Sequence, residues 1–284
     1  MRHTQTIATS VYDVNSQSGR TPRRGHVDEQ IELPRVLQQL WGIEGPARPG
    51  PKPAFHLSDI GQAAIRLADT GGLAAVSMSK VAAELGFTTM SLYRYVDSKD
   101  DLYAVMLEEV FGEAPEPVAG QDWRGRITEW AEAFRDSLRQ HPWILQVPVS
   151  EPPLSPNQLG WMESALQAFD GTPLTANERL SSMLLVNIYV RGTMQLTLSM
   201  LTLTPEEAAT AGRLYNQRLR LLATEDRFPA IAAGVHQPNS VEDLEVDFED
   251  DGFRDGLDTV LDGIQARIDR QSRIEAKAST DREG

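Results

Sequence analysis

Apolar residues recur at helical spacing along most of this chain, and no segment shows the alternation that a strand requires. The clearest stripe lies near the C-terminus and consists of Phe253, Leu257, Val260, Leu261, Ile264 and Ile268. Such stripes predict helices near 33–41, 57–71, 77–85, 88–96, 99–111, 122–140, 142–147, 155–170, 175–202, 205–224, 228–234 and 250–272. The sequence therefore predicts an all-α protein, with a polar tail that frays after Ser272.

The N-terminal part of the chain has a different composition from the rest. Residues 1–30 are polar and aperiodic, which favours disorder. After the short predicted helix, residues 45–53 are so rich in proline that they form neither a helix nor a strand ladder. We expect this segment to be an extended arm that carries Arg48 and Lys52.

The net charge of −14 is unevenly distributed. Residues 46–99 carry a net charge of +2, whereas residues 100–284 carry −16. A mildly basic segment ahead of an acidic body fits a protein that touches DNA at one end. There is no cysteine, which excludes disulfides, thiolate metal sites and cysteine nucleophiles. The chain also lacks a long uncharged apolar stretch and an apolar leader, so we expect a cytoplasmic protein without a membrane span.

Residues 77–99 contain the motif that bears most directly on function. They predict a short helix, a tight turn at Gly86 and a second short helix that begins at Thr88. The two helices are expected to pack through apolar residues, namely Val81, Ala82, Leu85, Phe87, Leu92 and Val96. This is the construction of a helix-turn-helix, in which the second helix is free to enter the major groove of DNA.

The run Leu92-Tyr93-Arg94-Tyr95-Val96, followed by Lys99 and Leu102, resembles the pattern of the TetR family of bacterial repressors. The resemblance extends with matching spacing from Ile60 to Phe111, and more loosely to the tetracycline-repressor-like C-terminal part around Gly256–Gly263. It implies an N-terminal three-helix helix-turn-helix DNA-binding domain over residues 55–112. It further implies a helical ligand-binding and dimerisation domain over 113–284, behind an extension over 1–54.

The resemblance also implies which residues meet DNA, position by position. These are Ser79, Thr88, Thr89, Met90, Ser91, Tyr93, Tyr95 and Lys99. Apart from this family pattern, we expect Arg48 and Lys52 of the arm to bind DNA as well, because arms of this kind can enter the minor groove beside the recognition helix. Thr88 would place the start of the recognition helix at a phosphate, and the residues after it would reach base edges. No arginine or glutamine lies in that first turn, so bidentate readout of guanine from there is impossible.

Each of these assignments has a structural alternative. Tyr93 and Tyr95 are also explained by packing within the domain, Lys99 by a solvated helix start, and Arg48 and Lys52 by a flexible linker. His141-Pro142-Trp143 is better explained by a turn between helices than by a metal or catalytic site, because no second histidine lies nearby in the sequence.

The resemblance implies a ligand cavity between the C-terminal helices. Candidate lining residues are Trp130, Phe134, Met162, Asn187 and Arg191, although most aromatic and methionine residues of this region must form core. Asn187 and Arg191 are the more informative pair, because a polar or charged group in an apolar helix needs a partner or a ligand. We also expect a homodimer, with Leu257, Leu261 and Ile264 at or beside its interface.

The function predicted is that of a DNA-binding transcriptional regulator, a repressor that a small-molecule effector releases from a pseudo-palindromic double-stranded DNA operator. The alternative is a DNA-binding regulator without such a ligand, controlled by its abundance or by a protein partner. An enzyme is the least favoured reading. The sequence contains no glycine-rich phosphate loop, nucleophile elbow or metal cluster, and it predicts no cofactor.

Overall fold

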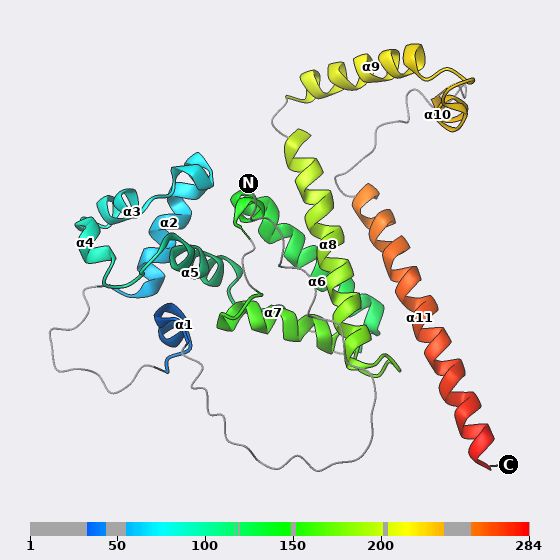
Figure 1. Cartoon of the computed structure of the whole chain (residues 1–284), viewed down its shortest axis with the longest axis horizontal. Coiled ribbons are helices and arrows are strands. Elements are labelled where there is room, and N and C mark those ends of the chain that lie inside the picture. Colours follow the sequence, from blue (N-terminus) through cyan, green and yellow to red (C-terminus); the bar gives the residue numbers. More distant parts are fainter. Residues whose placement is uncertain are drawn as a thin grey trace, which may run out of the picture. The chain divides into compact units, whose positions relative to one another are not determined.

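The computed structural model describes residues 33–43, 55–116, 118, 120–148, 152–200, 204–235 and 251–283. Residues Pro34 to Gly284 form one compact unit. Every regular element in the described part is a helix, as the all-α prediction required (Figure 1). None of the described helices is both long and apolar enough to span a membrane.

The first half of the chain forms a cluster of short helices. They are α1 (Arg35–Leu40), α2 (Leu57–Gly71), η1 (Leu73–Ala75), α3 (Met78–Glu84), α4 (Thr89–Leu92) and α5 (Lys99–Phe111). Helices α2 and α5 pack together along their lengths, and α3 packs on α4. The residues predicted to join α3 to α4 are in place, since Val81, Ala82 and Leu92 are almost wholly buried.

Hydroxyl caps fix where these helices begin. The side chains of Ser77, Thr88 and Ser98 accept hydrogen bonds from backbone N–H groups in the first turns of α3, α4 and α5. Gly86, in the turn between α3 and α4, has φ 72°, a conformation that disfavours any other residue. The recognition helix α4 ends at Leu92 and not near Val96 as predicted, because the chain continues as tighter turns in which Tyr95 N–H bonds to the Leu92 carbonyl.

The second half of the chain consists of longer helices. They are α6 (Trp123–Gln140), η2 (Pro142–Gln146), α7 (Pro156–Gln167), α8 (Ala176–Met200), α9 (Pro205–Leu222), α10 (Pro229–Val235) and α11 (Asp251–Glu283). Helix α8 packs against α6, α7 and α11. The expectation that the tail frays after Ser272 is wrong, since α11 continues to Glu283. Residues 273–283 are rich in alanine, lysine, arginine and glutamate, which favour helix.

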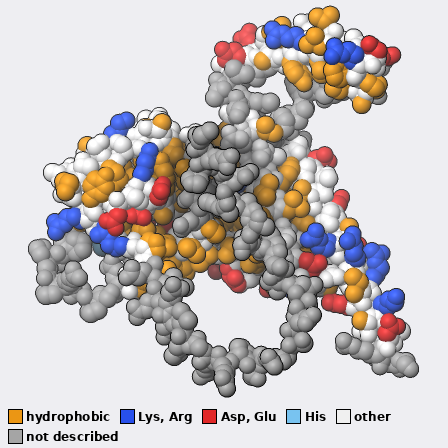
Figure 2. Space-filling model, viewed as in Figure 1, with side chains coloured by type: hydrophobic (Ala, Val, Ile, Leu, Met, Phe, Trp, Pro, Cys, Tyr) orange, Lys and Arg blue, Asp and Glu red, His pale blue; other side chains and the backbone are white. Residues whose placement is uncertain are grey.

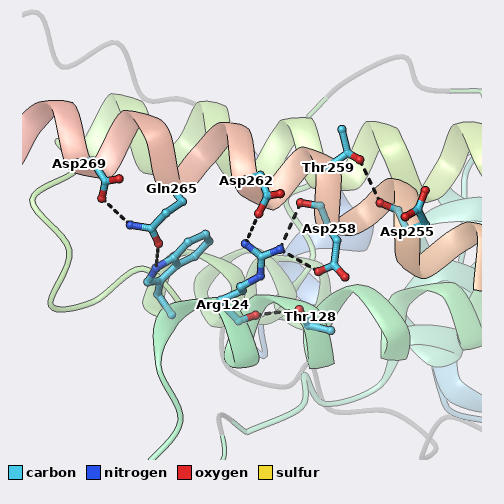
Figure 3. Close-up of polar contacts among 9 residues, drawn as sticks. Arg124, Thr128, Asp255, Asp258, Thr259, Asp262, Gln265 and Asp269 are labelled. Atoms are coloured by element: carbon cyan, nitrogen blue, oxygen red, sulfur yellow. Dashed lines mark hydrogen bonds and ion pairs between the residues drawn. The ribbon is translucent and has the colours of Figure 1, made fainter.

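Helix α11 is held by an apolar stripe with polar contacts beside it. Leu257, Leu261 and Ile264 are at most 3% exposed within the single chain. Beside them, Arg124 of α6 forms ion pairs of 2.9 Å with Asp258 and 2.7 Å with Asp262, as Figure 3 shows. The hydrogen bonds that Arg124 donates to Asp258 and Asp262 raise the pKa of its guanidinium.

The apolar stripe of α11 is covered within the single chain. Leu257, Leu261 and Ile264 have almost no exposed surface there. Their place at or beside a dimer interface stays a prediction. An apolar stripe in the sequence shows which face of a helix is covered, but not which chain covers it. One face of α8 carries a row of exposed apolar side chains, which include Leu180, Leu184, Leu185, Ile188 and Leu196.

We expect the apolar stripe to contribute more to holding α11 in place than the ion pairs of Arg124 with Asp258 and Asp262. Leu261→Ala should lower the free energy of unfolding by about 3 kcal/mol, because it leaves a cavity at a wholly buried site. Arg124→Ala should cost no more than about 1 kcal/mol, because its partners are solvent-exposed. Urea denaturation of both full-length variants at one protein concentration tests this ranking, and a larger loss in Arg124→Ala would reverse it.

Candidate nucleic-acid interface

The first turn of the recognition helix presents side chains with little hydrogen-bonding capacity. Met90 is 76% exposed, while Thr89 and Ser91 are half-buried. Thr88, which is exposed, accepts from the Ser91 N–H at 3.2 Å, and the two hydroxyls lie 2.9 Å apart. The thioether of Met90 is therefore the most available group, and it suits contact with the thymine methyl group better than hydrogen bonding.

The two tyrosines after this turn have different environments. Tyr95 is half-buried and its ring stacks on Phe87 at a centroid distance of 6.4 Å, while Phe87 meets Phe55 edge-on at 4.3 Å. Packing therefore accounts for much of the Tyr95 ring, as the alternative interpretation held. Tyr93 is 42% exposed and has no such stacking partner among the described residues.

Three exposed cations lie around α4. Lys99 is the first residue of α5, and its Nζ lies 5.4 Å from the centre of the Tyr103 ring. Arg94 follows the recognition helix, and Lys80 lies on α3. Ser79, also on α3, is exposed, and its hydroxyl lies 3.2 Å from that of Ser77. Figure 2 shows Lys and Arg side chains beside apolar ones over this region. The sequence analysis did not include Arg94 and Lys80 among the candidate DNA-binding residues, although their charge was a usable signal. Arg48 and Lys52 lie outside the described residues.

In the C-terminal helices, the predicted ligand residues fall into two groups. Trp130 and Phe134 stack at 5.3 Å, and the Arg191 guanidinium lies 5.3 Å from the centre of the Phe134 ring. Trp161 and Phe111 complete this aromatic cluster, and Trp130 donates a 2.9 Å hydrogen bond to the Trp161 carbonyl.

Met162 and Asn187, the other two candidates, are half-buried, and Met162 packs against the core. The structure therefore brings Trp130, Phe134 and Arg191 together, and it gives Met162 and Asn187 no comparable contact with them among the described residues.

A narrow hollow opens beside the aromatic cluster. It is lined by Pro115, Glu116, Arg126, Glu129, Trp130 and Ser164, and its volume of about 10 Å³ leaves room for little more than one water molecule. Pockets for drug-sized ligands usually measure roughly 300–1,000 Å³. A ligand of that size would need side chains of the cluster to move.

Comparison with known proteins places these features in one family. Residues 60–106 match "Bacterial regulatory proteins, tetR family", and residues 115–268 match "Tetracyclin repressor-like, C-terminal domain". The HTH-type transcriptional repressor DrrR1 of Streptomyces coeruleorubidus is 32% identical over 260 residues, which cover 89% of this chain and 94% of DrrR1. The chain belongs to the TetR family. Members of this family are DNA-binding transcriptional regulators and not enzymes.

Two further comparisons support the assignment. An HTH-type transcriptional regulator of Saccharopolyspora erythraea is 31% identical over 182 residues, which cover 64% of this chain and 75% of that protein. The fold is similar to that of ActR from Streptomyces coelicolor, with a TM-score of 0.65 and 22% identity over 78% of this chain and 99% of ActR. ActR has also been crystallised with (S)-DNPA and with actinorhodin.

Two polar contacts join the DNA-binding helices of this TetR-family chain to its C-terminal helices. The buried carboxylate of Glu108, on α5, accepts hydrogen bonds of 2.9 and 3.1 Å from the Asn157 N–H in the first turn of α7. Asp69, on α2, accepts a 2.7 Å bond from the Trp143 indole and lies 2.8 Å from His141 Nδ1. His141 thus lies in a turn that packs on the DNA-binding helices. Sequence reasoning missed both contacts, because their partners are far apart in the chain.

The exposure of Lys99 leads to a test of its role. Lys99→Ala should weaken binding to all DNA sequences about equally and should reduce the slope of log affinity against log salt by roughly one, because one phosphate contact is lost. Substitutions of Thr89 or Met90 should change base preference instead. Lys277→Ala serves as the control, because it removes one positive charge from an exposed position on α11, far along the chain from the recognition helix. A changed base preference with an unchanged salt slope in Lys99→Ala would contradict the assignment.

Proposed function

We propose that this protein is a dimeric repressor that a small, aromatic, anionic molecule releases from a pseudo-palindromic DNA operator. The single observation that carries the effector class is Arg191. It lies on α8 inside the C-terminal helices and faces the aromatic cluster. The release mechanism also draws on the relatives, of which DrrR1 is named a repressor and ActR has been crystallised with small molecules.

Arg191 favours an anion because its charge is poorly compensated. Burial lowers the pKa of its guanidinium. Among the described residues no carboxylate forms a salt bridge with Arg191. Its guanidinium lies over the ring of Phe134 instead. A partly buried cation without a carboxylate partner is unfavourable, and an anionic ligand would offset part of that cost. The rings of Trp130, Phe134 and Trp161 offer faces on which an aromatic ligand would stack.

The contacts between the DNA-binding helices and the C-terminal helices offer a route by which ligand binding would release DNA. A ligand that opens the cluster would displace Phe111 at the end of α5 and Trp161 on α7. The same two helices are joined by Glu108 and Asn157, so a shift of α7 would pull on α5. Helix α5 packs on α2 and begins at Lys99, next to the recognition helix. Such a shift would therefore move the two recognition helices of a dimer relative to each other.

The dimer itself is proposed to form through α8. Its exposed side chains Leu184, Leu185 and Ile188 are each about half exposed and lie on adjacent turns of one face. A self-complementary interface of this kind would pair two copies of α8 about a two-fold axis. Two recognition helices then read two half-sites, which a helix of one turn cannot do alone.

Selection from a random DNA pool with the purified full-length protein tests the regulator function. The expected result is an enriched sequence with two inverted half-sites. Enrichment of no sequence above non-specific binding would contradict the proposal. Enrichment without release by any small molecule would favour control by abundance or by a protein partner.

The α8 face leads to a test of assembly. Ile188→Lys should convert the dimer to monomers, because it would place an unpaired charge in the apolar contact. Val118→Lys changes another exposed apolar side chain and should leave the dimer intact. Sedimentation at micromolar concentration measures both variants. A monomeric wild type, or an Ile188→Lys dimer, would be incompatible with this interface.

The effector class is tested with two small aromatic molecules that share one ring system, of which one carries a negative charge and the other does not. Naphthalene-2-carboxylate should quench tryptophan fluorescence at lower concentration than its uncharged methyl ester, because only the acid offers Arg191 an anion. Arg191→Ala should abolish this difference, whereas Arg218→Ala, at an exposed site on α9, should keep it. Equal responses to acid and ester in the wild type would argue against an anionic effector.

A further inference from the structure

Helix α1 lies outside both segments that match the family, which cover residues 60–106 and 115–268. It nevertheless packs firmly. Val36 and Leu37 are 4% and 8% exposed, and the helix rests against α5. The two ends of α1 make polar contacts with different parts of the protein.

The first residue of α1 reaches the end of the recognition helix. Arg35 Nη1 donates to the carbonyl of Arg94 at 3.0 Å, and Nη2 donates to the carbonyl of Tyr93 at 3.2 Å. The same Nη2 lies 2.7 Å from the Asp97 carboxylate. Carbonyls at the end of a helix lack intrahelical donors and carry its partial negative charge, so a guanidinium there satisfies both needs.

The other end of the helix reaches the C-terminal part of the chain. The indole of Trp41 donates a 2.9 Å hydrogen bond to the carbonyl of Leu154. Leu154 immediately precedes Ser155 and α7, the helix that also binds Glu108 and stacks Trp161 on the aromatic cluster. Helix α1 thus touches both the recognition helix and the segment that leads into α7.

We propose that α1 is a clamp, in which Arg35 is a positioning residue for the recognition helix and Trp41 ties the clamp to the segment before α7. Its relevance to operator binding rests on the proposed function. Arg35 fixes the backbone between Tyr93 and Asp97, and with it the exposed Tyr93 and Arg94 side chains. Trp41 makes that position depend on the C-terminal helices by a second route besides α5.

The clamp positions the recognition helix without being needed for folding. The ion pair between Arg35 and Asp97 is weak in itself, because the two side chains are 39% and 61% exposed. The carbonyl bonds matter more, since α4 has only four residues and its intrahelical bonds cannot hold its end in place. Val36 and Leu37 would keep α1 docked when Arg35 is replaced, so Arg35→Ala should fold.

Hydrogen exchange of the full-length protein without DNA tests the clamp directly. Arg35→Ala should speed exchange of the amides of Arg94, Tyr95 and Val96 about fivefold or more, because their bonds to Ser91 and Leu92 lose support. Trp41→Phe keeps an aromatic side chain but removes the indole N–H donor, and it should act in the same direction to a smaller extent. Arg66→Ala removes an exposed ion pair with Glu84 in the same group of helices and should leave these amides unchanged.

Each outcome of this exchange experiment is decisive. Unchanged exchange in Arg35→Ala, or an equal change in Arg66→Ala, would overturn the clamp. An effect in Arg35→Ala alone, with Trp41→Phe like the wild type, would overturn the tie to α7. These readouts need no operator, so they stand even if the selection from random DNA fails.

DNA binding then separates positioning from direct phosphate contact. On the selected operator, Arg35→Ala should lose about tenfold in affinity while non-specific affinity stays within about twofold and the salt slope is unchanged. Arg35→Lys keeps the charge but not the planar fork, and it should resemble Arg35→Ala. A salt slope reduced by about one, with full rescue by lysine, would show that Arg35 binds phosphate and would overturn the positioning role.

Discussion

A recognition helix of a single turn cannot hold its own geometry. Short helices gain too few hydrogen bonds to repay the ordering of their backbone, so their stability comes from their neighbours. In this protein the Thr88 hydroxyl supports the start of α4, buried Leu92 anchors its last residue, and Arg35 binds the carbonyls beyond its end. Much of the rest of the N-terminal packing serves to hold these few residues in place.

Because α4 depends on its neighbours, the sequence could predict those parts of the recognition helix that local residues determine, but not those that distant residues determine. The starts of the helices were predictable, because Ser77 and Thr88 are local signals that act within three residues. The candidate surface around Met90 and Tyr93 followed from the family pattern. The partner of Arg35 was not predictable, because nearly sixty residues separate it from the carbonyls it binds and nothing local marks that pairing.

The buried stripe of α11 illustrates a different limit. Periodicity identified Leu257, Leu261 and Ile264 correctly as a buried face, but burial within a protomer and burial between protomers have the same pattern. For α8 the difficulty was the opposite. Val186 and Val190 are buried, whereas Leu184 and Ile188 are exposed. Apolar residues therefore lie on both sides of α8, and the spacing of apolar residues does not predict which side faces the core. Large apolar side chains of α9 and α10 also stay exposed, and they include Leu221 and Ile231. Figure 2 shows hydrophobic side chains on the surface of these two helices.

The acidic C-terminal half governs how the protein is distributed along a chromosome. Residues 100–284 carry a net charge of −16, and DNA repels a surface of that sign. In the described part of the chain, Lys80, Arg94 and Lys99 lie around the recognition helix, where positive charge favours approach to the phosphates. Repulsion from the acidic remainder would keep weak association with unrelated sequences low. A genome offers roughly a million or more such competing sites, and each one sequesters protein in proportion to its affinity. Low sequestration leaves more of the pool free, so few copies per cell suffice to occupy one operator.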